Sequence, residues 1–286
     1  MQRRFPGIVI FMAVIVSVVS GQTQNDYTSK NIGILKYVPA GTFQRDDTAT
    51  STSRVSAFRM SRYEITRAQF KSVMGVDPSA TFYSTGENDP VQQANWYHAI
   101  AFCNLLSIIE GLTPVYSVNG VDFAVLKYVD IPDRRNTAWD KVAADWTSNG
   151  YRLPTEMEWM WAAMGAKQGT TGRNKAFAGS TGMNKIGNYA WYSSNSNRSS
   201  NPAGSKLPNE LGLFDMSGNV WEWIWDWYGV YPTGAEADYR GAASGSRRVR
   251  RGGGWGNSAQ DCTVALRLNG EPQFQNRASG FRVVRP

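Results

Sequence analysis

A single cysteine, Cys262, closes the glycine-rich stretch GGGWGNSAQDC at residues 252–262. A thiol at the end of such a loop could act as a redox or metal-binding group, because the thiolate is both a nucleophile and a ligand for soft metals. Alternatively, the small polar residues before Cys262 could form an exposed surface whose side chains are free to differ. The two interpretations lead to an oxidase and to a binding protein.

Few other residues could take part in such chemistry. The chain has one more cysteine, Cys103, and one histidine, His98. Both lie in the segment 96–106, whose apolar residues recur with helical spacing. We therefore interpret Cys103 as a small buried hydrophobe and His98 as a packing residue. Two buried free thiols are expected, although an exported protein would permit a disulfide.

The composition indicates a folded, loop-rich domain of the α+β class. Hydrophobic residues make up 42% of the 286 residues, charged residues 19%, and there are 28 glycines. Periodicity and capping residues predict strands at 34–38 and 58–65 and helices at 68–74, 96–110 and 155–164. Thr155 and Glu158 form a capping box at the start of the third helix. A hairpin with a turn at Asn119-Gly120 is expected over 115–130.

The N-terminus has the pattern of an export signal. Residues 1–4 form a short basic segment with two arginines, and residues 5–19 form an apolar run that is shorter than a membrane-spanning helix. We expect a signal peptide over 1–21, a flexible tether over 22–33 and one domain over 34–286; a buried N-terminal helix is the alternative. Gly21 stands where a bacterial lipoprotein would need a cysteine. The expected location is the cell surface or outer membrane, or otherwise the periplasm or the medium.

The positive charge is concentrated near the C-terminus. Residues 240–286 contain nine arginines, no lysine and two acids, a surplus equal to the formal net charge of +7 for the whole chain. These arginines alternate with glycine and apolar residues, a pattern that favours carboxylate pairing and aromatic stacking over nucleic-acid binding. Nucleic acid is therefore not an expected partner.

Four ordered stretches resemble the landmarks of a known family. They are YRLPTEMEW at 151–159, NELGLFDMSGNVWEW at 209–223, RGGGW at 251–255 and GFRVV at 280–284. Together they resemble the formylglycine-generating enzyme (sulfatase-modifying factor) family over about residues 34–286. The resemblance implies an elaborated C-type-lectin-like fold with short, mostly antiparallel strands and a few helices.

The same resemblance argues against the family's chemistry. Its oxygenases hold copper(I) between two cysteine thiolates, and here Cys262 falls at the second position while Asn257 falls at the first. An amide cannot replace a thiolate for soft Cu(I). Related iron-dependent sulfoxide synthases use three histidines, and this chain has only His98. We therefore expect no enzymatic activity and no copper, with a thiol oxidase that uses Cys262 alone as an alternative.

The stretch 255–280 also resembles the variable region of proteins diversified by retroelements, many of which share this fold. Fixed framework positions would be Arg251, Gly252, Gly253, Trp255, Ala259, Val264, Ala265, Arg267, Pro272, Gly280, Phe281 and Arg282. The variable-like positions, most of which an adenine-altered AAC codon could encode, are Gly256, Asn257, Ser258, Asp261, Thr263, Leu266, Leu268, Asn269, Gly270, Phe274, Asn276, Arg277 and Ala278, followed by Ser279. An ordinary loop in a catalytically silent relative is the alternative.

This resemblance implies an exported, non-enzymatic protein that binds a ligand with the region at about 251–286. A rigid scaffold can exchange exposed side chains at little cost in folding free energy, since such substitutions change it by under about 0.5 kcal/mol. The partner would be a macromolecule, either a protein or a surface glycan. The sequence does not constrain the oligomeric state.

A structural calcium ion is a further implication of the family resemblance. Asp215, Gly218, Val220 and Glu222 match positions that supply its oxygen ligands. The alternative is a buried ion pair between Glu222 and one of the C-terminal arginines. Glu271-Pro272-Gln273 is similar to a sugar-binding signature of C-type lectins, so a calcium-dependent lectin is a second functional alternative, although chance explains so short a match better.

Overall fold

The structure, a computed structural model, describes residues 25–169 and 175–286. The predicted signal peptide lies outside these residues. Within them, no helix combines the length and the apolar character needed to cross a bilayer.

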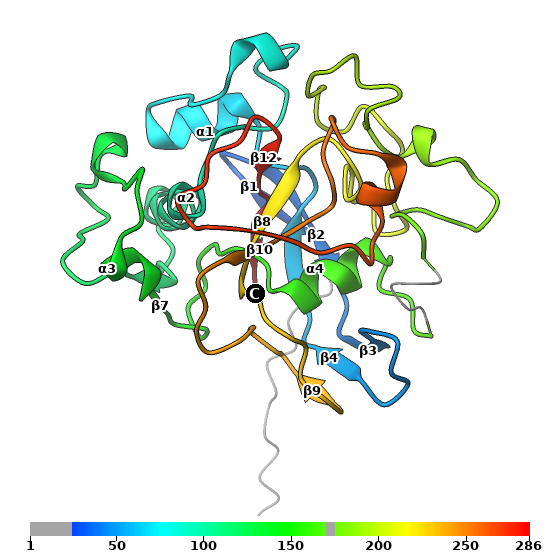
Figure 1. Ribbon diagram of the computed structural model, residues 1–286. Helices are drawn as coiled ribbons and strands as arrows, with labels where there is room; N and C mark the ends of the chain where they lie inside the picture. Colours follow the sequence, from blue (N-terminus) through cyan, green and yellow to red (C-terminus); the bar gives the residue numbers. More distant parts are fainter. Residues whose placement is uncertain (1–24, 170–174) are drawn as a thin grey trace, which may run out of the picture.

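Two four-stranded sheets form the middle of the molecule (Figure 1). The first contains, in spatial order, β1 (Tyr27–Ser29), β2 (Gly33–Val38), β5 (Phe58–Ser61) and β13 (Val284–Arg285), all antiparallel. The second contains β11 (Leu268–Gly270), β10 (Arg248–Arg251), β8 (Trp221–Trp227) and β12 (Ser279–Gly280), with β12 parallel to β8. Smaller sheets pair β3 (Gly41–Gln44), β4 (Thr52–Val55) and β9 (Glu236–Ala237), and β6 (Tyr116–Ser117) with β7 (Ala143–Ala144).

In the described part of the chain, four α-helices and four short 3-10 helices accompany the sheets. They are α1 (Arg67–Met74), α2 (Trp96–Ile109), α3 (Thr137–Asp140), α4 (Glu156–Ala163), η1 (Thr81–Tyr83), η2 (Tyr128–Asp130), η3 (Ile186–Asn188) and η4 (Ala259–Cys262). The three helices predicted from the sequence are α1, α2 and α4. Thr66, Asn95 and Thr155 cap them, each accepting a hydrogen bond from the third backbone amide of its helix. The predicted α+β class is thus confirmed.

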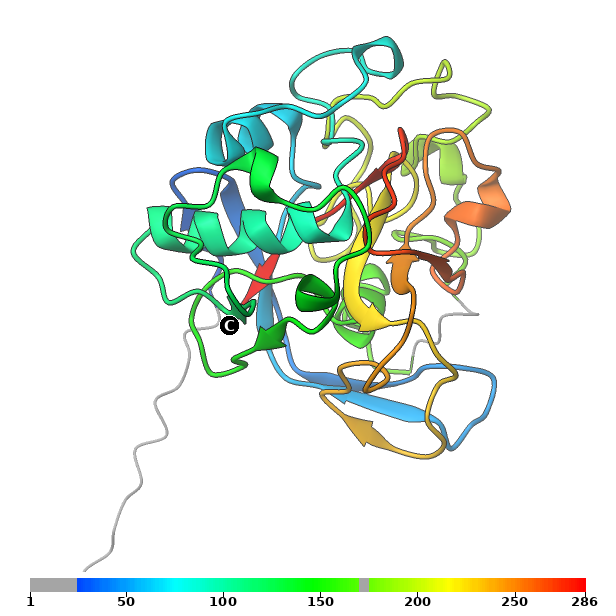
Figure 2. The same cartoon turned by 60° about the vertical axis from the view of Figure 1, so that its left-hand side comes forward.

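The helices cover the sheets with apolar side chains. The helix α2 lies beside the first sheet (Figure 2), and its Phe102 stacks on Phe70 of α1 and packs edge-on against Phe281. All eight residues of α4 are buried, including Trp159 and Trp161. Because α4 is buried on every side, it packs with residues of both sheets, such as Val38 and Ile224, in one of two apolar clusters.

Two sequence predictions are wrong. The chain turns at Asn119-Gly120, but β6 pairs with β7, more than 20 residues onward, instead of with the segment that follows the turn. The tether predicted over 22–33 is contradicted from Tyr27 onward, because β1 pairs with β2 and Ser29 is buried against Glu110. A strand of three residues, such as β1, is too short to show the alternation of apolar and polar residues from which a strand is predicted.

The C-terminal arginines have the structural roles that their spacing predicted. Arg282 is fully buried and forms a bidentate ion pair with Glu222, with Nε and Nη2 each 2.7 Å from a carboxylate oxygen. The indole Nε1 of Trp159 donates to the same carboxylate over 2.8 Å. One buried acid therefore joins β8, the C-terminal segment and α4.

Replacement of this acid tests that connection. Glu222→Gln leaves the Arg282 guanidinium buried without its countercharge, and we expect the free energy of unfolding to fall by about 3–5 kcal/mol. The measurement is urea unfolding followed by tryptophan fluorescence. Glu87→Gln is the matched control, because the Lys71–Glu87 pair is exposed and 3.4 Å apart; it should cost under about 1 kcal/mol. Equal losses from both variants would contradict this role of Glu222.

Candidate ligand-binding face

The chain leaves β10 through a glycine turn that passes directly over Cys262. Gly253 has φ of 82°, and a Cβ there would lie 2.6 Å from the Sγ of Cys262. Only glycine fits so close an approach. Cys262 ends η4, where Ser258 and Asp261 form a reciprocal capping box. The chain then runs through β11 and returns across the molecule to β12 (Figure 1, orange to red).

The segment between η4 and β12 is held mainly by hydrogen bonds to its backbone carbonyl oxygens. The buried guanidinium of Arg251 donates to three successive loop carbonyls, those of Val264, Ala265 and Leu266. Five further loop carbonyls accept hydrogen bonds from groups outside or at the edge of the loop. Backbone amides donate to three of them: Ser193 to Asn257, Gln93 to Asn276, and Trp221 to Ala278. Side chains donate to the other two: Arg250 Nη2 to Asn269 and Trp255 Nε1 to Arg277. A backbone carbonyl is present whatever the side chain, so these bonds survive substitution of the residues that accept them.

The predicted framework and variable-like positions differ in exposure. Gly256, Ser258, Leu268, Phe274 and Arg277 are exposed, and Asn257, Asp261, Thr263, Leu266, Asn269, Asn276 and Ala278 are half-buried. Of the framework set, Arg251, Gly252, Gly253, Trp255, Val264, Pro272, Gly280, Phe281 and Arg282 are buried, whereas Ala259 and Arg267 are half-buried and Ala265 is exposed. Most variable-like side chains therefore reach the surface.

Two positions in the variable-like set do not fit the prediction. Gly270 is buried in β11, and a Cβ there would lie 2.8 Å from the ring of Trp223. Ser279 is fully buried in β12 and accepts a hydrogen bond from Arg250 Nη1 at 2.9 Å. Both residues pack in the second sheet, so neither is a free display position, and the prediction is wrong for them.

A hollow of about 520 Å³ opens beside this loop, between η1 and the segment 197–199. Trp255 and Arg277 contribute to its wall from the loop. The ring of Tyr83 stacks on Trp255 with centroids 5.6 Å apart, and the Arg277 guanidinium lies 4.4 Å from the Tyr83 centroid. Arg277 Nη1 also donates to the Tyr83 hydroxyl over 2.6 Å. Phe82, 86% exposed, packs edge-on against Tyr83. The result is an aromatic platform that carries one cation.

Sequence reasoning missed the part of this hollow that lies outside the loop. Phe82 and Tyr83 form an aromatic pair within an otherwise polar stretch, which is the only local signal. Asn197 and Arg198 both have positive φ, 55° and 63°, an uncommon backbone conformation for two successive non-glycine residues. Nothing in their residue types indicated that they would lie beside Trp255.

The residues first considered for chemistry are buried. Cys103 and Cys262 are both fully buried and free, as the sequence predicted. Burial raises the pKa of the Cys262 thiol to about 12, so it is not a thiolate at neutral pH. Burial also lowers the pKa of His98 to about 4. The His98 ring stacks on Tyr128, and its Nδ1 accepts from the backbone amide of Asn95.

The proposed calcium ligands form a different arrangement. Both oxygens of Glu222 are taken by Arg282 and Trp159, so the alternative of a buried ion pair is what the structure contains. Asp215 and Glu64 are buried nearby. Asp215 Oδ2 accepts from Gly204 N, and its Oδ1 has no partner among the described residues. Glu222 therefore does not fit as a calcium ligand, and calcium binding stays a prediction without support at this residue.

The pKa values of Asp215 and Glu64 are both raised. Burial raises the pKa of Asp215 to about 6, with the charge of Glu222 as a further contribution. Burial, together with the charges of Asp215 and Glu222, also raises the pKa of Glu64 well above its usual range. Glu64 accepts from the backbone amide of Val220, while the backbone amide of Gly218 donates to Gly252. This acid cluster therefore supports the turn before β8.

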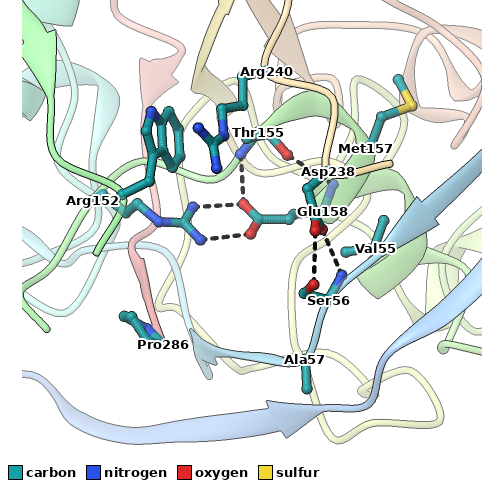
Figure 3. Close-up of a pocket in the computed structure, with 11 residues that line it drawn as sticks. Val55, Ser56, Ala57, Arg152, Thr155, Met157, Glu158, Asp238, Arg240 and Pro286 are labelled. Carbon is teal, nitrogen blue, oxygen red and sulfur yellow. Dashed lines mark hydrogen bonds and ion pairs between the residues drawn. The ribbon is translucent and has the colours of Figure 1, made fainter. Parts of the chain in front are cut away.

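A second hollow, of about 220 Å³, lies at the N-terminus of α4 (Figure 3). Arg152 forms a bidentate pair with Glu158, with both distances 2.6 Å. Asp238 accepts from the amide and the hydroxyl of Ser56, both at 2.7 Å. Since Arg152, Glu158 and Asp238 are satisfied by one another or by Ser56, this part of the hollow is interpreted as scaffold.

Comparisons with known proteins identify the family of this chain and several similar proteins. A family model described as "Sulfatase-modifying factor enzyme 1-like domain" matches residues 17–286. The chain is 31% identical to "Chaperone protein LppX" of Paenibacillus barcinonensis, covering 97% of this chain and 98% of that protein. It is 27% identical to the formylglycine-generating enzyme of Bos taurus, with 86% of this chain and 72% of that protein covered. Among solved structures, Treponema denticola variable protein 1 is similar, with a TM-score of 0.83 and 39% sequence identity. The match covers 92% of this chain and 99% of that one.

The acid cluster gives a pH-dependent expectation. A carboxyl whose pKa is raised on folding holds its proton more tightly in the native state, so stability falls as the pH rises from about 4 to about 6. A rise of this pKa from about 4 to about 6 corresponds to about 3 kcal/mol of stability. We expect Asp215→Asn to remove most of this loss, because it stays neutral and asparagine tolerates the positive φ of 55°.

The measurement is urea unfolding of both proteins at pH 4.5 and pH 7.5, each with calcium and with a chelator. The expected result is a smaller pH-dependent loss of stability in the variant than in the parent, and the response of each protein to the chelator tests the predicted calcium ion. A stabilisation of the parent by calcium that disappears in Asp215→Asn would show instead that a calcium ion neutralises the cluster.

Proposed function

This chain belongs to the sulfatase-modifying factor enzyme 1-like domain family, and we propose that it is an exported, non-enzymatic member that binds a macromolecular ligand. Its fold is the elaborated C-type-lectin-like fold of the formylglycine-generating enzyme type, as the sequence resemblance implied. The proposed binding face consists of the exposed variable-like side chains together with Phe82, Tyr83 and Trp255.

One observation carries this proposal most directly. Buried framework groups bind the loop through its carbonyl oxygens, while the side chains at the same positions point outward or lie half-buried. A loop fixed in this way can change its side chains and keep its course. That separation of support from display is the property that a diversified binding site requires, and it resembles the logic of an antibody paratope.

The exposed residues favour a protein as the ligand. Phe274 and Leu268 are 40% and 37% exposed, and Phe82 is 86% exposed. Arg277 is prearranged on Tyr83 and Trp255, so less side-chain freedom is lost when it binds. Aromatic and arginine side chains dominate the energies of protein interfaces. The similarity to a variable protein and to a protein named as a chaperone agrees with this choice.

Two alternatives remain from the sequence. A thiol oxidase would need a reactive Cys262, but this thiol is buried beneath Gly253 and its pKa is raised. A calcium-dependent lectin would use Glu271-Pro272-Gln273, but Pro272 is buried and Gln273 Nε2 donates to Glu271 within the tripeptide. Neither arrangement favours the alternative over protein binding.

Export and surface display form part of the proposal. They rest on the basic segment and the apolar run of residues 1–19. Diversification by a retroelement has a separate genomic test. A near-copy of the coding segment for residues 255–279 that differs only at adenines would support it, and its absence would favour an ordinary loop.

Selection from a library tests whether this face can bind proteins. Codons for Ser258, Leu268, Phe274 and Arg277 are randomised, and variants are selected for binding to hen lysozyme, which the parent is not expected to bind. We expect binders with micromolar or better affinity, about −8 kcal/mol, measured by surface plasmon resonance. A matched library at the exposed residues Val125, Val129, Met183 and Val230 should give none. Equal success of both libraries, or failure of the first, would contradict the proposal.

Titration with copper tests the oxidase alternative. Because the Cys262 thiol is buried and Asn257 occupies the position of a second thiolate, we expect no stoichiometric uptake of Cu(I) under reducing conditions. The comparison is with Cys262→Ala, which should behave in the same way. Uptake of one equivalent by the parent that Cys262→Ala abolishes would overturn the binding-protein proposal.

A further inference from the structure

A third hollow, of about 710 Å³, lies at the opposite end of β8 from the ligand-binding face. Trp221, at the start of β8, donates from its indole to Asn257 of the loop, whereas Trp225 and Trp227, near its end, line this hollow. Six residue steps of a strand span about 20 Å. None of the residues that line the hollow is a variable-like position, although β11 pairs with β10 at Arg248. The size of the hollow is typical of a small-molecule site.

The wall of this hollow contains more cations than carboxylates: Arg135, Lys141, Arg240 and Arg248 line it, with Asp140 as the one acid among the lining residues. Arg248, 2% exposed, lies between Trp96 and Trp227, with its guanidinium carbon 3.7 and 3.4 Å from the two ring centroids. Its Nη1 donates to the carbonyl of Trp225, and its Nε has no hydrogen-bond partner in the described part of the chain. Nor do residues 25–169 and 175–286 place a carboxylate within ion-pair distance of Arg248, Lys141 or Arg240.

The acids nearest to these cations are already engaged. Asp140 accepts from the Tyr97 hydroxyl at 2.6 Å and pairs with Arg135 at 3.0 Å. Asp226 lies between Trp225 and Trp227 in sequence, so it points to the other face of the strand, where its Oδ2 accepts from the backbone amide of Glu156. The hollow therefore keeps an uncompensated positive charge.

A buried cation without a countercharge is costly. Burial lowers the pKa of Arg248 to about 9. The exposed guanidinium of Arg240 lies 4.2 Å from the centroid of Trp146 and contributes to the walls of both this hollow and the one at α4, where it stands unpaired beside the Arg152–Glu158 pair (Figure 3). An anion that entered the hollow would meet three cations and would supply the missing countercharge.

Aromatic and small residues make up most of the rest of the wall. Trp225 and Trp227 are half-buried, so part of each indole faces the hollow, and Ala242 and Ala243 contribute small side chains beside the polar Thr137 and Ser244. We propose that this hollow is a second binding site, for a small organic anion that combines a flat apolar body with a carboxylate or phosphate group. This site does not depend on the ligand of the loop face.

Calorimetric titration of the whole domain with four probes tests the proposal. The probes are 2-naphthoate, 2-naphthyl phosphate, the neutral isostere 2-naphthamide, and inorganic phosphate. We expect at least one naphthyl anion to bind with a Kd below about 1 mM and at least tenfold more tightly than either naphthamide or inorganic phosphate. The ratio of the Kd values of the two naphthyl anions shows whether the site prefers a carboxylate or a phosphate.

Matched variants locate the binding. Lys141→Ala with Arg240→Ala should weaken the preferred anion at least tenfold. Arg247→Ala, which removes an exposed arginine outside this hollow, should change its Kd less than twofold. The thermal midpoint of each variant verifies folding. Failure of both naphthyl anions to bind, equal binding of the amide, or an equal effect of Arg247→Ala would overturn the proposal.

Discussion

The buried ion pair between Glu222 and Arg282 is the interaction on which the rest of the structure depends. It joins β8 to the C-terminal segment, and the indole of Trp159 attaches α4 to the same carboxylate. Arg267 and Arg251 add pairs to Glu156 at the start of α4, at 2.7 and 3.5 Å. The core is thus linked by arginines that belong to the C-terminal region. Because buried pairs are costly to break, these residues hold the ends of the loop in place whatever lies between them.

That arrangement separates a scaffold from a display surface. Most framework side chains of the loop are buried, and its glycines let the backbone pass over Cys262 and Trp159. Arg251 binds the loop through carbonyl oxygens, so the support does not depend on the side chains it displays. Cys262 belongs to the scaffold: its thiol packs under Gly253 in the way a small apolar side chain would. The thiol that first suggested catalysis is thus used for packing.

The sequence predicted what is encoded locally and missed what depends on tertiary contacts. Capping residues such as Thr66 and Thr155 identified helix starts because a cap is a short-range hydrogen bond. The hairpin at 115–130 failed because β6 pairs with β7, for which the intervening segment gives no signal. Similarly, Tyr83 reaches Trp255 across 172 positions of sequence. The codon type of Gly270 predicts an exchangeable position, whereas its burial against Trp223 can be seen only in the folded sheet.

The central claim is that the loop keeps its structure when its displayed side chains change together. The most direct measurement is the free energy of unfolding of a variant carrying Leu268→Ser, Phe274→Ser and Arg277→Ser, compared with the single variant Arg251→Met. We expect the triple variant to lose under about 2 kcal/mol, since exposed substitutions have small effects. Arg251→Met should lose at least about 3 kcal/mol, because three loop carbonyls lose their donor. The opposite order would contradict the claim.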